Sequence, residues 1–237
     1  MGQVSEEDWQ NLLHKLRQNG RVVPSAAAAE APSTGSVNRD AACDPHRLSA
    51  SGVFARYWQA SFALIEARGV PDAIRAQVDE VREYADHLDA NLREGVGMLL
   101  KGPVGTMKTT LAVAVMQRQL QEGGQAMFLT MPSLLDSIFS AKAVSPEDWN
   151  RFEMNLRQVP LLVLDDLGAE WSAGWGMTKV DAIFSERYNR QRSTIVTTNL
   201  GSGEMKNRYA DRIIDRLRAT SRVITFNTPL SLRETCV

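Results

Sequence analysis

The stretch Gly102-Pro103-Val104-Gly105-Thr106-Met107-Lys108-Thr109 decides the fold class of this 237-residue chain. It matches the phosphate-binding P-loop pattern G-x-x-x-x-G-K-[ST] at every fixed position except Met107, where the pattern has glycine. Apolar residues precede the stretch and a helical pattern follows it, which is the strand-to-helix context that this loop requires. At such a helix N-terminus, backbone N–H groups and the helix dipole attract a polyphosphate. We therefore expect the chain to bind a nucleoside triphosphate.

The residue types of the loop indicate what each would contact. Lys108 would reach the outer phosphates of ATP, and the Thr109 hydroxyl would meet Mg²⁺. The residues that we expect to contact the nucleotide are Gly102, Pro103, Val104, Gly105, Thr106, Met107, Lys108, Thr109 and Thr110.

Met107 is the sharpest departure from the pattern, because a side chain narrows the allowed φ and ψ angles of the backbone. A positive φ at this residue would cost about 1–2 kcal/mol and lower affinity or turnover by about tenfold. Since the other fixed positions are retained, we expect a negative φ and a thioether that packs outward. Met107→Gly should then change ATP affinity by less than about threefold.

Composition and charge set the broad class of the protein. With 43% hydrophobic and 23% charged residues, the chain can form one full domain with an appendage. A net charge of −1 argues against nucleic-acid binding driven by bulk charge, so any DNA contact must be local. Cys43 and Cys236 make no metal-ligand spacing with the three histidines. We expect a cytoplasmic protein, because no stretch resembles a membrane span and the acidic start is unlike a signal peptide.

Three segments follow one another along the chain. Over 1–21 a capping pattern at Ser5 and apolar residues at helical spacing predict an amphipathic helix that binds a partner. Residues 22–49 are rich in Pro, Ala and Ser and are predicted to be a flexible linker. The ATPase domain is expected over 50–237, with leading helices over 53–93 that pack on it.

Beyond these helices, predicted strands and helices alternate, which favours a five-stranded parallel sheet with helices on both faces. The strands are expected near 98–101, 126–130, 161–164, 194–197 and 222–226. The third is a continuous apolar run, as in a central strand that is buried on both faces.

Polar residues end two of these strands, at the sheet edge where α/β proteins place their ligands. Asp165 and Asp166 follow the third strand and have the form of a Walker B element. We expect Asp165 to hold Mg²⁺ and Asp166 to orient or deprotonate the attacking water. Asn199 follows the fourth strand and would lie beside Asp166 if that strand lies between the first and the third. It could position the water or touch the γ-phosphate, or it could be a simple turn residue.

The last predicted helix carries a basic stripe of Arg208, Arg212 and Arg216, spaced by four residues. An adjacent apolar stripe contains Tyr209, Ile213 and Leu217. We expect the apolar stripe to pack and the basic stripe to face out. By itself, such an arginine row is as readily a solvated face with surface ion pairs.

Four motifs together resemble the DnaC/IstB-type AAA+ family of helicase loaders, over roughly 50–237. They are Leu161-Leu162-Val163-Leu164-Asp165-Asp166-Leu167-Gly168-Ala169-Glu170, Ser185-Glu186-Arg187-Tyr188-Asn189-Arg190, Thr197-Thr198-Asn199-Leu200 and Asp215-Arg216-Leu217. The resemblance implies an α/β P-loop ATPase of the additional-strand (AAA+) type that assembles as a homo-oligomer with ATP at subunit interfaces. It also implies binding of single-stranded DNA and delivery of a replicative DNA helicase. Arg216 is then the candidate arginine finger, with Arg212 second.

The chain departs from the family pattern at several places. Besides Met107, the sequence ends about ten residues after the last predicted strand, so we expect no C-terminal lid domain, and Arg233 is a weak substitute for a lid arginine. The second Walker B acid is Asp166 rather than the longer glutamate, which favours slow turnover.

Two other functions stay open. One is a transposition helper of the IstB type that acts on duplex DNA, and the other is a nucleotide-gated scaffold that binds ATP without hydrolysing it. A small-molecule kinase is disfavoured, because no Arg-rich lid segment is present.

Overall fold

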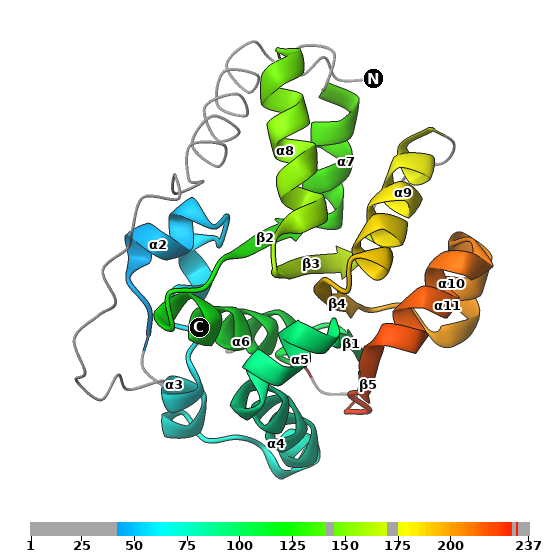
Figure 1. Cartoon of the computed structure of the whole chain (residues 1–237). Helices are drawn as coiled ribbons and strands as arrows, with labels where there is room; N and C mark the ends of the chain where they lie inside the picture. Colours follow the sequence, from blue (N-terminus) through cyan, green and yellow to red (C-terminus); the bar gives the residue numbers. More distant parts are fainter. Residues whose placement is uncertain (1–41, 141–144, 170–174, 229–230, 232–237) are drawn as a thin grey trace, which may run out of the picture.

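A five-stranded parallel sheet forms the middle layer of the structure (Figure 1). The structure is a computed structural model, and it describes residues 42–140, 145–169, 175–228 and 231. The elements are α2 (Pro45–Ala50), the short 3-10 helix η1 (Ala55–Tyr57), α3 (Phe62–Ala67), α4 (Asp72–Asp86), α5 (Leu88–Glu94), β1 (Gly97–Lys101), α6 (Lys108–Gln121), β2 (Ala126–Thr130), α7 (Met131–Ser140), α8 (Pro146–Gln158), β3 (Leu161–Leu167), α9 (Trp175–Asn189), β4 (Ser193–Thr198), α10 (Ser202–Arg208), α11 (Asp211–Thr220) and β5 (Ser221–Thr225). Each predicted strand is present within a few residues of its expected bounds.

The strand order is β2-β3-β4-β1-β5, and all neighbouring strands run parallel. β4 therefore lies between β1 and β3, which confirms the predicted additional-strand arrangement. This order brings the carboxyl ends of β1, β3 and β4 to one edge of the sheet, and the P-loop follows β1 at that edge.

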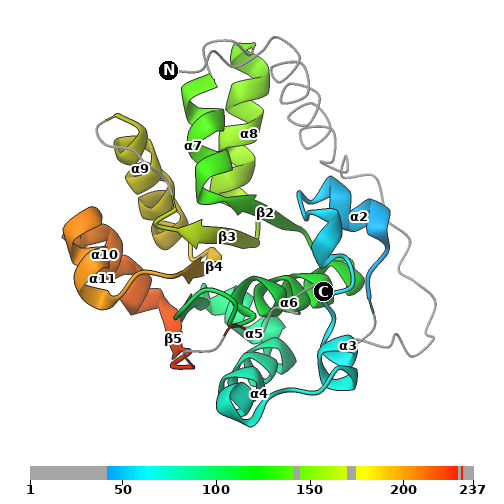
Figure 2. The same cartoon turned by 180° about the vertical axis from the view of Figure 1, so that it is seen from behind.

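Alternating side chains along each strand send the core to both faces of the sheet. On β1, Met98 and Leu100 pack with α2 to α6 in one buried cluster, whereas Leu99 packs in a second cluster with α7 to α11. Figures 1 and 2 show the two sets of helices on opposite sides of the strands. The sheet with helices on both faces is thus confirmed.

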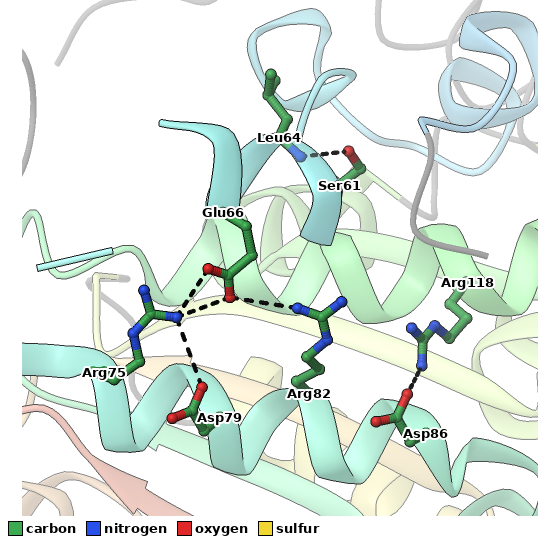
Figure 3. Close-up of polar contacts among 8 residues, drawn as sticks. All are labelled: Ser61, Leu64, Glu66, Arg75, Asp79, Arg82, Asp86 and Arg118. Atoms are coloured by element: carbon green, nitrogen blue, oxygen red, sulfur yellow. Dashed lines mark hydrogen bonds and ion pairs between the residues drawn. The ribbon is translucent and has the colours of Figure 1, made fainter. Parts of the chain in front are cut away.

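The leading helices α3 and α4 are joined to α6, the helix that begins at the P-loop (Figure 3). Glu66 of α3 accepts hydrogen bonds from Arg75 and Arg82 of α4, at 2.9 and 3.4 Å. Arg118 of α6 pairs with Asp86 of α4, and its side chain is 5% exposed. The guanidinium carbons of Arg82 and Arg118 lie 5.8 and 5.3 Å from the centre of the buried Phe62 ring. These ion pairs and the contacts of two guanidinium groups with one buried ring connect α3, α4 and α6.

The predicted boundary of the linker at residue 49 is wrong. Cys43 and Leu48 are 6% and 0% exposed in the cluster that also covers β1, and α2 begins at Pro45. The sequence hid this because a six-residue helix carries too little periodicity to stand out from a Pro- and Ala-rich stretch. The predicted N-terminal helix, 1–21, lies outside the described residues. Within the part of the chain that is described, no helix is both long enough and apolar enough to cross a bilayer.

Candidate nucleotide-binding site

The P-loop connects β1 to α6 and depends on glycine where its backbone passes close to other atoms. Gly102 has φ 149°, and a Cβ at this residue would lie 2.3 Å from the carbonyl oxygen of Phe226. Gly105 has φ 83°, in the left-handed region that favours glycine. The loop therefore has the backbone form for which the sequence pattern selects glycine.

Lys108 begins α6, and its side chain folds back over the loop. The Nζ atom donates hydrogen bonds to the carbonyl oxygens of Gly102 and Pro103, at 2.8 and 2.7 Å. The residue is only 6% exposed. The ammonium group thus lies within the curve of the loop, where phosphate oxygens would replace carbonyl oxygens as its acceptors.

The prediction that Met107 has a negative φ is wrong. Its φ is 64° and its ψ is 10°, so the residue adopts the left-handed conformation that favours glycine. The predicted outward orientation is also wrong, because the half-buried side chain packs against the core cluster on the α6 side of the sheet. The loop thus keeps its glycine geometry, since the thioether gains apolar contacts that offset part of the backbone strain.

Asp165 lies within β3 rather than after it as predicted, and it connects the P-loop to β4. Its Oδ1 atom accepts hydrogen bonds from Thr109 Oγ1 at 2.8 Å and from Thr197 Oγ1 at 2.6 Å. Burial raises the pKa of the Asp165 carboxyl above its usual value and the charge of Asp166 adds to this, whereas the two threonine hydroxyls and Lys108 oppose it. A buried carboxylate beside a threonine hydroxyl is an oxygen donor set that suits Mg²⁺, which takes one or two protein carboxylates together with substrate phosphates.

A β-bulge separates the roles of the two acids. Leu164 pairs with Val196 and Leu167 pairs with Thr198, so β3 has one more residue than β4 in this interval. Asp166 is one of the two residues of β3 that lie opposite Thr197, and its φ is 56°. Its N–H donates a hydrogen bond to Thr197 Oγ1 at 3.0 Å. Such bulges re-aim side chains next to active sites. Here, Asp165 is 3% exposed, whereas Asp166 is half-buried.

Thr197 contacts both acids, although the sequence pattern assigns it no role. Its hydroxyl donates to the Asp165 carboxylate and accepts from the Asp166 backbone. The residue is fully buried in a central strand, where a threonine is ordinary by β-propensity. The pairing of β4 with β3 gives a signal for this role, because a polar residue near the end of β4 can face the carboxylates of β3.

Asn199 follows β4 as predicted and is exposed. The preceding residue, Thr198, donates a hydrogen bond from its hydroxyl to the Leu167 carbonyl oxygen at 2.5 Å. The end of β4 is therefore tied to the end of β3, and Asn199 begins the chain beyond that tie. Its contact with water or the γ-phosphate stays a prediction.

The predicted single basic stripe is wrong in one of its three members. The chain leaves the helical conformation at Tyr209 and Ala210, so Arg208 belongs to α10 while Arg212 and Arg216 belong to α11. Arg208 instead donates a hydrogen bond to the Gly168 carbonyl oxygen, next to the Walker B strand. The predicted apolar residues Tyr209, Ile213 and Leu217 are all buried, as expected.

Arg212 and Arg216 of α11 both contact the neighbouring helix α9. Arg212 lies 2.6 Å from the Asp181 carboxylate and its side chain is 61% exposed. Arg216 donates to Ser185 Oγ at 2.6 Å and lies 3.4 Å from Asp181, with 29% of its side chain exposed. The expectation that this stripe simply faces outward therefore holds for Arg212 better than for Arg216.

The residues at this sheet edge fit a nucleotide and a magnesium ion. The P-loop backbone and Lys108 offer donors to phosphates, and Thr109 and Asp165 offer oxygens to the metal. Among the described residues, no group of three or more His, Cys, Asp or Glu side chains forms a metal site of its own.

The sequence matches the family described as "IstB-like ATP binding protein" over residues 74–234. It is 24% identical over 154 residues to the replicative helicase loader DnaC of Escherichia coli (strain K12), covering 65% of this chain and 60% of that protein. A crystal structure of the DnaC helicase loader is similar with a TM-score of 0.65 and 24% identity, over 73% of this chain and 99% of that one. A replication initiator DnaA bound to AMPPCP and single-stranded DNA gives a TM-score of 0.59 at 18% identity, over 71% of this chain and 51% of that one. The two structures confirm the predicted fold, and the chain spans about 60% of the length of the E. coli loader that it matches.

Proposed function

Because the chain belongs to the family of IstB-like ATP-binding proteins, we propose that it is an ATP-dependent loader of a replicative DNA helicase, with slow ATP hydrolysis. The observation that carries the ATP-dependent part is the contact of the P-loop Thr109 with Asp165, and of Asp165 with Thr197. The similarity to the E. coli loader supports the helicase as the partner.

In this proposal, residues near the ends of β1, β3 and β4 have different roles in ATP binding and hydrolysis. Lys108 binds the outer phosphates, and Thr109 with Asp165 holds Mg²⁺, which when bound neutralises charge on the phosphates. Asp166, which is less buried than Asp165, orients the attacking water and accepts its proton. Asn199 lies near that water at the end of β4. Asp166 is one carbon shorter than glutamate, which favours slow turnover.

The proposed arginine finger comes from a second copy of the chain. Arg216, with Arg212 beside it, would contact the ATP of a neighbouring subunit, where an arginine finger is worth about 10³–10⁵ in rate. ATP then lies at the interfaces of a homo-oligomer. In that assembly, nucleotide state controls the binding of single-stranded DNA, and the predicted helix over 1–21 binds the helicase.

The test of the loader function is co-purification of the full chain with candidate replicative helicases, with and without ATP. Lys108→Ala should lose the ATP dependence of the complex, and Trp9→Ala with Leu13→Ala should lose helicase binding while ATP still binds. A complex that forms equally with every variant would contradict the proposal. Failure of the Trp9/Leu13 variant to bind ATP would instead place that helix on the ATPase domain.

Two alternatives have specific support. The match to the IstB-like family leaves room for an IstB-type transposition helper that acts on duplex DNA, and preferential binding of duplex over single strands would select it. The other alternative, a nucleotide-gated scaffold without hydrolysis, is motivated by the two departures from the family pattern, Met107 in the P-loop and Asp166 as the second Walker B acid. Measurable single-turnover hydrolysis, abolished by Asp166→Asn, would exclude that scaffold.

A further inference from the structure

Arg216 is held by three side chains from one helix, α9, which lies beside α11 (Figures 1 and 2). Its Nη1 atom donates to Ser185 Oγ at 2.6 Å and lies 3.4 Å from Asp181 Oδ1. Its guanidinium carbon lies 6.0 Å from the centre of the Tyr188 ring. These three positions follow one another at helical spacing on α9, so one face of that helix forms a cradle for one arginine. We call Asp181, Ser185 and Tyr188 the α9 cradle.

Among the described residues, Arg216 shares its one carboxylate partner, Asp181, with a second arginine. Asp181 is mostly buried, and its Oδ2 atom pairs with Arg212 at 2.6 Å. One carboxylate thus faces two arginines, and Arg212 makes the closer contact. The nearest partner of Arg216 is instead a neutral hydroxyl. A net positive charge at this position suits a phosphate group that approaches from outside the subunit.

The contacts also leave part of the guanidinium available. Within the described residues, every side-chain polar contact of Arg216 uses Nη1, and 29% of the side chain is exposed. A guanidinium carries five N–H donors in a rigid plane, so fixing one nitrogen and one face sets the direction of the others. A group held in this way loses less conformational entropy when it binds a phosphate.

We propose that the α9 cradle positions Arg216 for the ATP of a neighbouring subunit, with Asp181, Ser185 and Tyr188 as positioning residues. This inference rests on the proposed trans role of Arg216. It gives separate roles to the residues of the motif Ser185–Arg190. Ser185 and Tyr188 hold the finger, whereas Arg187 is buried against α8 and β4 and has a structural role.

The test measures ATP hydrolysis in mixtures of two full-length variants, because a finger and an ATP site on different subunits can complement each other. Asp166→Asn inactivates the ATP site and keeps the finger, whereas Arg216→Ala does the reverse. If the cradle positions the finger, Asp181→Asn and Ser185→Ala should each lower kcat by about tenfold and change ATP affinity by less than about threefold. Mixing either variant with Asp166→Asn should restore activity, and mixing it with Arg216→Ala should not.

Matched variants and outcomes separate positioning from a loss of structure. Ser185→Thr keeps the hydroxyl and should keep kcat, and Asp211→Asn removes an exposed carboxylate from the same helix as Arg216 and should also keep kcat. Ser185→Ala provides the test if Asp181→Asn fails to fold. Recovery with Arg216→Ala, or unchanged kcat in both cradle variants, would overturn the inference. If Arg216→Ala and Asp166→Asn fail to complement each other, the trans role itself is wrong and the inference falls with it.

Discussion

Replacing Met107 tests whether the P-loop holds a strained residue. The φ of 64° places Met107 in a conformation that costs a non-glycine residue about 1–2 kcal/mol. Its half-buried side chain packs on the core and recovers about 1 kcal/mol, half the value for a fully buried methionine. Met107→Gly therefore removes the strain and the packing together, and glycine adds about 0.5–1 kcal/mol of unfolded-state entropy. The net change in the free energy of unfolding should be close to zero.

Met107→Ala separates the two effects, because alanine keeps the Cβ atom and the strain but loses the packing. We expect it to be about 1 kcal/mol less stable than the natural protein and also less stable than Met107→Gly, by denaturant unfolding. An alanine variant as stable as the glycine variant would refute the positive φ.

ATP affinity should respond differently from stability. The strain of the positive φ is present with and without nucleotide, so it cancels from the binding equilibrium, and the tenfold loss of affinity expected from a positive φ does not follow. Because the side chain packs on the core, Met107→Gly should change the Kd for ATP by less than about threefold. A gain above tenfold would contradict this cancellation and support an impaired site in a nucleotide-gated scaffold.

Three further substitutions test the site and its support. Thr197→Val removes the hydroxyl that contacts both acids, so it should lower kcat at least tenfold and leave ATP affinity unchanged. Thr197→Ser keeps the hydroxyl and should retain activity, and equal turnover in the two variants would contradict a role for the hydroxyl. Because the pKa of Asp165 is raised in the folded protein, ionisation of this carboxyl lowers the stability of the fold as pH rises through that pKa. In urea unfolding, Asp165→Asn should therefore be more stable than the natural protein at pH 7.5 and should lose this advantage near pH 4. A variant that is less stable than the natural protein at pH 7.5 would contradict this prediction. Arg187→Met should lower the free energy of unfolding by about 1–3 kcal/mol, because it leaves the buried carbonyl oxygens of Leu156, Val159 and Ser193 without their donor, and removal of a guanidinium whose pKa is lowered by burial offsets part of that loss. The exposed Arg190→Met is its control, and equal losses in the two would refute the structural role.

The parallel sheet could be predicted because apolar strands alternate with helical patterns, and the family resemblance supplied the place of the fourth strand between the first and the third. Apolar runs that end in Asp165 or in Asn199 mark strands whose carboxyl ends meet at one edge. Thr109 and Asp165, predicted as metal ligands from the sequence, lie within hydrogen-bonding distance of each other.

The errors come from features that residue types do not encode. The sign of φ at Met107 is set by the closed loop around it, and packing of the side chain on the core offsets only part of the cost of that conformation. The break between α10 and α11 falls at Tyr209 and Ala210, and no Gly or Pro marks it. Thr197 was missed because its role depends on a bulge in the strand beside it.

Loading of helicase onto closed circular single-stranded DNA tests the central claim most directly, because a circle offers no end for threading. A candidate replicative helicase is incubated with the circle, ATP and the full chain, and the helicase retained on the DNA is measured by gel filtration. The proposed function predicts that the chain raises retention at least tenfold and that Lys108→Ala does not. Equal retention without the chain, or with Lys108→Ala in its place, would contradict the claim.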